Sequence, residues 1–157
     1  MNIQIEMENG GIIKAELYPE VAPITVENFV KLINEKFFDG LVFHRVIEGF
    51  MIQGGGFDAV GKHKEADSIK GEFDANGVKN ELKHTRGVLS MARTSFPNSA
   101  SSQFFIMHKD SPHLDGQYAA FGKVTEGLEV IDKIAGVATD FQDCPLEPQV
   151  IESIRLG

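Results

Sequence analysis

Two stretches in which apolar and polar residues alternate, on either side of Asn9-Gly10, most constrain how this chain can fold. A period of two is typical of a strand with one buried face. Asn and Gly tolerate the positive φ that a tight turn between two strands requires. The chain is therefore predicted to begin with an antiparallel β-hairpin. Its apolar positions are Ile3, Ile5, Met7, Ile13, Ala15 and Leu17.

Short apolar runs separated by glycine-rich turns recur along the rest of the chain. Apolar residues at helical spacing predict one helix after Pro23, with Thr25 as its cap and Asp39-Gly40 as its end, and a shorter helix over residues 127–135. About eight strands and two helices favour a sandwich or a barrel. Residues 54–86 form a weakly patterned, polar loop, and loops of this length are often functional. The further strands are expected at 41–47, 50–53, 87–92, 103–107, 119–124 and 150–156.

Composition excludes several classes of protein. With 157 residues the chain is expected to form one domain, residues 1–157. A net charge of -8 argues against nucleic-acid binding, because such domains usually carry a basic face. No run approaches the roughly 20 apolar residues of a membrane span. Met1–Gly10 lacks the pattern of a signal peptide, and Cys144 is the only cysteine, so we expect a cytoplasmic protein without an internal disulfide.

Motifs for metals, nucleotides and covalent nucleophiles are incomplete. Gly56–Lys62 matches most of a phosphate-binding loop, but His63 stands where Ser or Thr should hold magnesium. The five histidines lack ligand spacing, and one cysteine cannot build a structural zinc site. Ser90, Ser101 and Ser102 are not in a Gly-x-Ser-x-Gly elbow. We therefore expect no metal, no cofactor and no covalent intermediate.

The segment Phe43–Gly55 has the most distinctive composition, because Arg45 and Gln53 lie among large apolar residues. This mixture suits an apolar cleft with a few fixed hydrogen-bond donors. The reversal at Glu48-Gly49 should bring Arg45 and Gln53 close together. Whether they share a face depends on strand register. Taken alone, an arginine in a strand is more often an exposed ion-pairing residue.

Together with other blocks, this segment resembles the cyclophilin-type peptidyl-prolyl isomerases. The blocks are Ala22–Phe29, Phe43–Gly55, Leu82–His84, Gly87–Ala92, Ser102–Ile106, Leu114–Gly116 and Phe121–Val124. The resemblance implies a mainly β fold, a closed eight-stranded antiparallel β-barrel capped by two α-helices, with a substrate groove on its outside. It implies that Arg45 is catalytic and that Gln53 binds the substrate backbone. The remaining groove residues would be Phe50, Met51, Phe105 and Leu114 around the proline ring, with Ala92, Gln103, His113 and Tyr118 completing the groove.

Three departures from the family pattern indicate a bacterial-type member. His113 stands where many members carry tryptophan, Tyr118 replaces a frequent histidine, and the turn from Arg93 to Pro97 is one residue longer. Together they leave at most weak binding of a cyclosporin-type ligand and leave open which residue is preferred before proline. The implied partners are proline-containing peptides and unfolded or flexible protein segments, bound by a monomer.

The expected reaction is rotation about Xaa-Pro peptide bonds, whose barrier is about 18–20 kcal/mol and which needs no cofactor. Two other functions are compatible with such a chain. A non-catalytic proline-peptide binding or chaperone module would use the same groove, and Arg45 favours the enzyme over it. A barrel with a small ligand inside would need an open interior, whereas the large side chains of eight short strands suffice to fill it.

Overall fold

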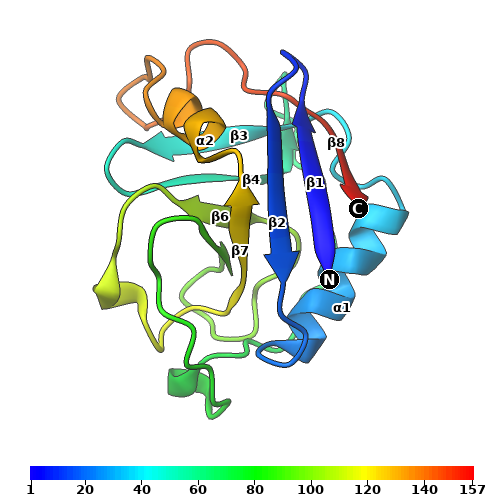
Figure 1. Cartoon of the computed structure of the whole chain (residues 1–157), viewed down its shortest axis with the longest axis vertical. Helices are drawn as coiled ribbons and strands as arrows, with labels where there is room; N and C mark the ends of the chain where they lie inside the picture. Colours follow the sequence, from blue (N-terminus) through cyan, green and yellow to red (C-terminus); the bar gives the residue numbers. More distant parts are fainter.

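The computed structural model describes residues 1–157, and its eight strands form one antiparallel sheet that curls into a barrel (Figure 1). The order of strands across the sheet is β3-β4-β6-β5-β7-β2-β1-β8. The strands are β1 (Asn2–Met7), β2 (Ile12–Leu17), β3 (Leu41–Ile47), β4 (Met51–Asp58), β5 (Val88–Met91), β6 (Phe104–Met107), β7 (Ala120–Glu126) and β8 (Ile151–Leu156).

The two edge strands of this order, β3 and β8, meet and nearly close the barrel. Val42 and Val150 form a single antiparallel bridge. Beside it, the Phe43 N–H donates to the Gln149 carbonyl at 3.0 Å and the Gly40 N–H to the Ile151 carbonyl at 2.8 Å. The expected eight-stranded barrel is thus confirmed, with a few hydrogen bonds at the closure in place of a full ladder.

Two α-helices cover the barrel (Figure 1). Helix α1 (Pro23–Asn34) packs against β8, whereas α2 (Leu128–Ala135) packs against β2, β3 and β4 at the other end. Two short 3₁₀ helices, η1 (Asp74–Asn76) and η2 (Pro112–Leu114), lie in the loops.

Element types follow the sequence pattern, but four local predictions are wrong, and the fourth, the cap of α1, is described below. The first hairpin pairs Ile5 with Ile13 as expected, yet its strands are joined by Glu8–Gly11, longer than a two-residue turn. Helix α1 ends at Asn34, well before Asp39-Gly40. Strand β4 continues through the glycine run to Asp58, so part of the predicted 54–86 loop is strand. Each element boundary depends on pairing partners that are distant in the sequence.

Side chains that alternate along the strands divide the apolar residues into two groups. Inward-facing residues join a cluster of 31 buried residues that fills the barrel, in which the Phe29 ring lies 5.2 Å from Phe104 and 5.1 Å from Phe121. A smaller cluster of buried residues lies on the outside. Its members are Met51, Val88, Phe105, Met107, Leu114 and Ala120. The outer cluster forms the floor of the site described below.

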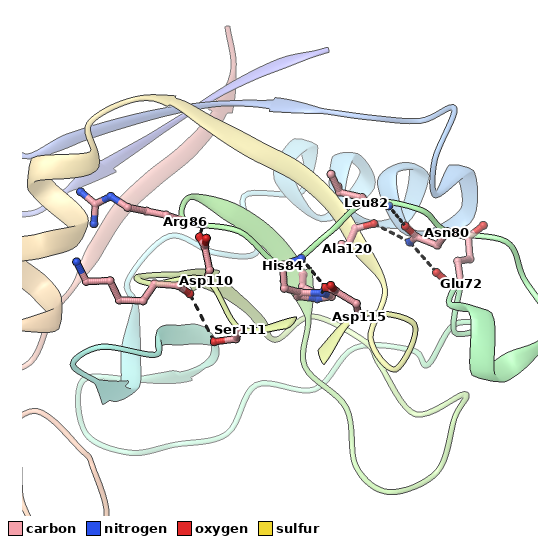
Figure 2. Close-up of polar contacts among 11 residues, drawn as sticks. Glu72, Asn80, Leu82, His84, Arg86, Asp110, Ser111, Asp115 and Ala120 are labelled. Atoms are coloured by element: carbon pink, nitrogen blue, oxygen red, sulfur yellow. Dashed lines mark hydrogen bonds and ion pairs between the residues drawn. The ribbon is translucent and has the colours of Figure 1, made fainter. Parts of the chain in front are cut away.

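A buried asparagine fastens the long irregular segment between β4 and β5 to the barrel (Figure 2). The Asn80 amide donates to the carbonyls of Glu72 and Ala120, both at 2.9 Å, and its Oδ1 accepts the Leu82 N–H at 3.1 Å. Asn80 is only 5% exposed, so these bonds are made away from water. The segment is therefore ordered by polar contacts and not by an apolar pattern, which is why its sequence looks featureless.

Thr25 does not cap α1 as predicted, because the start of the helix is held by a remote carboxylate. The N-cap residue is Ala22, and no side chain caps the helix locally. Instead, Glu72 Oε1 accepts the Thr25 N–H at 2.6 Å and the Thr25 hydroxyl at 2.8 Å. Thr25 and Glu72 are 0% and 2% exposed. A carboxylate placed at a helix N-terminus satisfies unpaired N–H groups and interacts favourably with the helix dipole.

Replacing Glu72 with Ala should lower the free energy of unfolding by about 1–3 kcal/mol, because two buried donors of Thr25 lose their acceptor. Urea denaturation followed by circular dichroism measures the change. Glu20→Ala, at an exposed residue before the same helix, serves as the control and should change stability little. Equal stability of the Glu72 and Glu20 variants would contradict this role for Glu72.

Candidate active site

Arg45 is presented to solvent by a β-bulge in strand β3. Phe43 pairs with Gly54 and Arg45 pairs with Gln53, so two steps on β3 match one step on β4, and His44 is the extra residue. A bulge re-aims side chains and is common beside active sites. The inward neighbours Phe43 and Val46 are buried, whereas Arg45 is exposed. The register that the sequence left open thus places Arg45 and Gln53 together.

Two amides connect Arg45 to strand β6. Arg45 donates weakly to Gln53 Oε1 at 3.4 Å, and Gln53 Nε2 donates to Gln103 Oε1 at 3.1 Å. Arg45 makes no ion pair. Its guanidinium carries five N–H donors, and the protein uses only one of them. The side chain is therefore available to an acceptor outside the protein.

Beside Arg45 lies an apolar pocket of about 130 Å³. Its floor consists of Met51 from β4 and Phe105 from β6, which point outward because their neighbours Ile52 and Phe104 point into the barrel. The ring of Tyr118 stands edge-on to Phe105 at 5.7 Å. The lining residues are Arg45, Phe50, Met51, Gln53, Ala92, Arg93, Phe105, Leu114 and Tyr118. This set includes eight of the ten residues predicted for the site.

Gln103, one of the remaining two predicted residues, lies in an adjoining polar hollow of about 190 Å³ that shares Gln53, Ala92 and Arg93 with the apolar pocket. The glycine run of β4 makes room for its side chain. A Cβ at Gly56 would lie 2.5 Å from Gln103 Cγ, closer than real contacts allow. His113 is the other predicted site residue that does not line the apolar pocket. It is exposed, and its ring lies 5.8 Å from the Phe50 ring, at the rim and outside the pocket.

Arg93 lines the pocket, although no role was predicted for it. Its guanidinium lies 4.7 Å from the ring centres of both Tyr118 and Phe73. Its Nη2 and Nε donate to the Gln117 carbonyl at 2.6 Å and 3.2 Å. A single arginine in a polar loop has no sequence signature, so only the folded loops could reveal this contact with Tyr118.

His84 lies behind the pocket and ties its walls together (Figure 2). Its Nδ1 lies 3.0 Å from Asp115 Oδ1, which also accepts the His84 N–H at 2.6 Å, and its Nε2 lies 2.9 Å from the Ser90 hydroxyl. The His84 ring is nearly parallel to Phe105, with centres 6.1 Å apart. Asp115 follows Leu114 in the chain, and the His84 ring lies against Phe105. The network therefore positions Leu114 and Phe105, two residues of the pocket.

Asp115, His84 and Ser90 are hydrogen-bonded in the same arrangement as the catalytic triad of a hydrolase, but these three residues cannot act as one. Ser90 is 0% exposed and His84 is 1% exposed, so no substrate carbonyl could reach the hydroxyl. The network is therefore structural. This agrees with the absence of a nucleophile motif in the sequence.

Burial and mutual hydrogen bonding shift the pKa values of His84 and Asp115. Burial lowers the pKa of His84 despite the opposing effect of Asp115. Burial alone would raise the pKa of Asp115, but the hydrogen bonds and charge of His84 leave it below the usual value. His84 is therefore neutral at pH 7, with an ionised carboxylate next to it.

His84→Gln should remove part of the pH dependence of stability. The folded-state pKa of His84 lies below 6.5, so as pH falls below about 6.5 the unfolded chain gains protons that the folded ring resists, and stability is lost. Urea denaturation at pH 7 and pH 5 should give a smaller difference for the variant than for the native protein. At pH 7 the variant should be less stable by about 1–3 kcal/mol. His63→Gln, at an exposed ring, should keep the native pH slope; an unchanged slope in His84→Gln would refute the assignment.

No group of three or more His, Cys, Asp or Glu side chains is arranged to hold a metal ion. None of the helices is both long enough and apolar enough to cross a membrane.

Comparisons with known proteins agree with this geometry. The model of the family described as cyclophilin type peptidyl-prolyl cis-trans isomerase/CLD matches residues 2–156. A peptidyl-prolyl cis-trans isomerase of Acinetobacter baylyi is 46% identical over 166 residues, covering 99% of this chain and 86% of the relative. Peptidyl-prolyl cis-trans isomerase B of Escherichia coli is 44% identical, covering 95% and 96% of the two chains.

A solved structure extends the likeness to the whole fold. The crystal structure of a Cryptosporidium parvum cyclophilin type isomerase, determined in the presence of the dipeptide Ala-Pro, superimposes with a TM-score of 0.85. It is 30% identical, and the match covers 100% of this chain and 99% of that one. An outward arginine beside an apolar pocket, on a barrel of this topology, is thus accompanied by similarity along the entire chain. The chain belongs to the cyclophilin-type peptidyl-prolyl cis-trans isomerases, and it is an enzyme of the isomerase class.

Proposed function

We propose that Arg45 is the catalytic residue and that the adjoining apolar pocket holds the proline ring of the substrate. In a planar peptide bond the nitrogen lone pair is delocalised. When the bond twists, the lone pair becomes localised and can accept a hydrogen bond. A guanidinium aimed at the prolyl nitrogen then binds the twisted form more strongly than either planar form, which is the condition for catalysis.

The observation that carries this proposal is the state of Arg45 itself. The side chain is exposed, makes one long hydrogen bond of 3.4 Å to Gln53, and borders the proline pocket. A cation that only stabilised the fold would be paired with a carboxylate, as Arg155 is with Asp39 at 2.8 Å. Arginine suits the reaction because it stays charged and its donors are rigidly arranged.

The pocket supplies the second half of the mechanism by fixing the ring while the preceding carbonyl rotates. Met51, Phe105 and Leu114 are 2%, 5% and 7% exposed, so these walls are set by packing before a substrate binds. Phe50 and Tyr118 are partly buried and close the sides. Gln53 binds the substrate backbone in this proposal, which is supported by the hydrogen bond from Arg45 to its side-chain Oε1. His84 keeps Phe105 and Leu114 in place without touching substrate.

Proline-containing peptides and flexible segments of unfolded or folding proteins are the substrates we infer, with the chain acting as one monomeric unit. The related C. parvum enzyme was crystallised in the presence of Ala-Pro, which supports a pocket for a prolyl residue in this family. A cyclosporin-type ligand should bind weakly, because the small exposed His113 borders Phe50 at the rim.

Arg45→Ala should reduce kcat/KM for a short Xaa-Pro peptide about 100-fold or more while leaving the fold intact, since loss of one aimed donor has an effect of this size. Arg45→Lys should recover little, because a lysine presents a point charge and no rigid fork. NMR exchange spectroscopy measures the rates. Lys62→Ala removes another exposed positive charge, outside the proline pocket, and should be neutral. Turnover by a folded Arg45→Ala variant that is comparable to that of the native protein would refute the proposal. If the native protein binds the peptide but does not accelerate its isomerisation, the chain is a binding module.

Phe50→Ala should weaken both binding and rate, because it opens one side of the proline pocket. Loss of a partly buried aromatic contact corresponds to about tenfold in KM. The same NMR assay over a range of peptide concentrations separates KM from kcat. Ile24→Ala, at a residue 42% exposed on α1, is the matched apolar truncation away from the site and should change neither. If both constants stay native in Phe50→Ala, Phe50 does not contact the substrate.

A further inference from the structure

A second cavity, of about 440 Å³, adjoins the other side of Arg45. It shares Arg45 with the proline pocket and none of that pocket's other residues. Its walls come from residues 42–45 of β3, the end of β4 with the following turn, and the loop that leads to β8. Side chains on these three walls include His44, Phe57, Cys144, Pro145 and Pro148. Nothing in the mechanism proposed above uses this space.

The two loops that form the mouth of this cavity are held in fixed turns, each by one aspartate. Asp58 Oδ1 accepts the N–H groups of Val60 at 3.0 Å and Lys62 at 2.9 Å. Asp140 Oδ1 accepts those of Gln142 at 2.8 Å and Cys144 at 3.1 Å. Binding there would therefore require little ordering of the backbone, which favours affinity.

Both loops expose large apolar side chains at their tips. Val60 is 89% exposed, between the cavity-lining residues Ala59 and Gly61. Phe141 is 94% exposed next to Gln142, and Leu146 is 65% exposed next to Pro145. None of these side chains belongs to either apolar cluster of the fold. Apolar groups gathered around a hollow are typical of a surface that binds another chain.

The innermost wall is uncharged at neutral pH. The His44 ring lies 4.6 Å from the Phe57 ring and makes no hydrogen bond within the protein, and its Nδ1 is fully buried. Burial lowers the pKa of His44 to about 4, so the ring carries no charge at pH 7. Asp58, the carboxylate in the lining, already accepts two backbone N–H groups. The wall formed by His44 and Phe57, away from Arg45, therefore suits an apolar side chain better than a charged one.

We propose that this cavity is a second subsite, which binds an apolar side chain of the same client polypeptide whose Xaa-Pro bond lies at Arg45. The proposal rests on the assignment of the proline pocket, because Arg45 is the residue that joins the two spaces. A chain leaving the prolyl residue past Arg45 reaches the mouth formed by residues 57–63 and 140–148. The lining residues Phe57, Pro145 and Pro148 then contact an apolar side chain that has entered. Such a subsite favours clients that carry exposed apolar residues near proline, as unfolded segments do.

A peptide series tests the subsite directly. A single leucine is moved along an otherwise Gly/Ser-rich Xaa-Pro peptide, from two to five residues on either side of the proline, and kcat/KM is measured by NMR exchange. Leucine at one position, or at two adjacent ones, should raise kcat/KM about three- to tenfold, as expected for partial burial of its side chain. Cys144→Trp, which fills the cavity, should abolish this gain and leave turnover of the leucine-free peptide unchanged.

Two further variants make the outcome decisive. Ala59→Trp narrows the same cavity from an exposed position, so it tests the site even if Cys144→Trp does not fold. Glu20→Trp places equal bulk in an unrelated hollow and should retain the leucine gain. No gain at any position, or a gain that persists in both cavity variants, would overturn the subsite while leaving the isomerase assignment intact. Failure to accelerate even the leucine-free peptide would instead refute the function proposed for Arg45.

Discussion

The alternation of side chains across β4 and β6 is the constraint on which this structure depends. Ile52, Phe104 and Ile106 point inward and fill the barrel, and this forces Met51, Phe105 and Met107 to point outward. The outer residues would be an exposed apolar patch on an ordinary barrel. Here they pack with Leu114, and Met51 and Phe105 become the floor of the site. A filled interior and an external groove are therefore two consequences of one strand register.

The site is held in place from behind by buried polar groups as well as by the outer apolar cluster. Glu72, Asn80 and His84 are at most 5% exposed, and each satisfies backbone or side-chain groups of segments far apart in the sequence. Such contacts are costly to leave unpaired, so they fix loops in a single arrangement. This is how a long segment without apolar periodicity can support a pocket whose walls must be rigid. The exposed Arg45 and the apolar tips of the 57–63 and 140–148 loops are the opposite case, with side chains that the fold itself does not use.

Sequence reasoning succeeded where the pattern is local. The hairpin, the second helix and the approximate place of each strand could be predicted, although not the full length of β4, because their periodicity lies within a few residues. The blocks around Phe43–Gly55 and Ser102–Ile106 were enough to indicate the family and most of the pocket residues. Sequence reasoning failed at the start and end of α1, and in the 54–86 segment. Glu72 holds Thr25 across 47 positions in the sequence, and no local signal can indicate such a partner.

The sequence by itself indicated about eight strands in a sandwich or a barrel, and its resemblance to the cyclophilins implied the closed barrel and the residues that we propose for the site. These inferences depend on residue types and their order along the chain. Only the tertiary structure decided that the bulge at His44 turns Arg45 outward beside Gln53, that Arg93 stacks on Tyr118, and that His113 stays at the rim. It also brought the 57–63 and 140–148 loops together around a second cavity at Arg45. Register and loop packing are set by contacts between distant segments, and these contacts form only when the barrel closes.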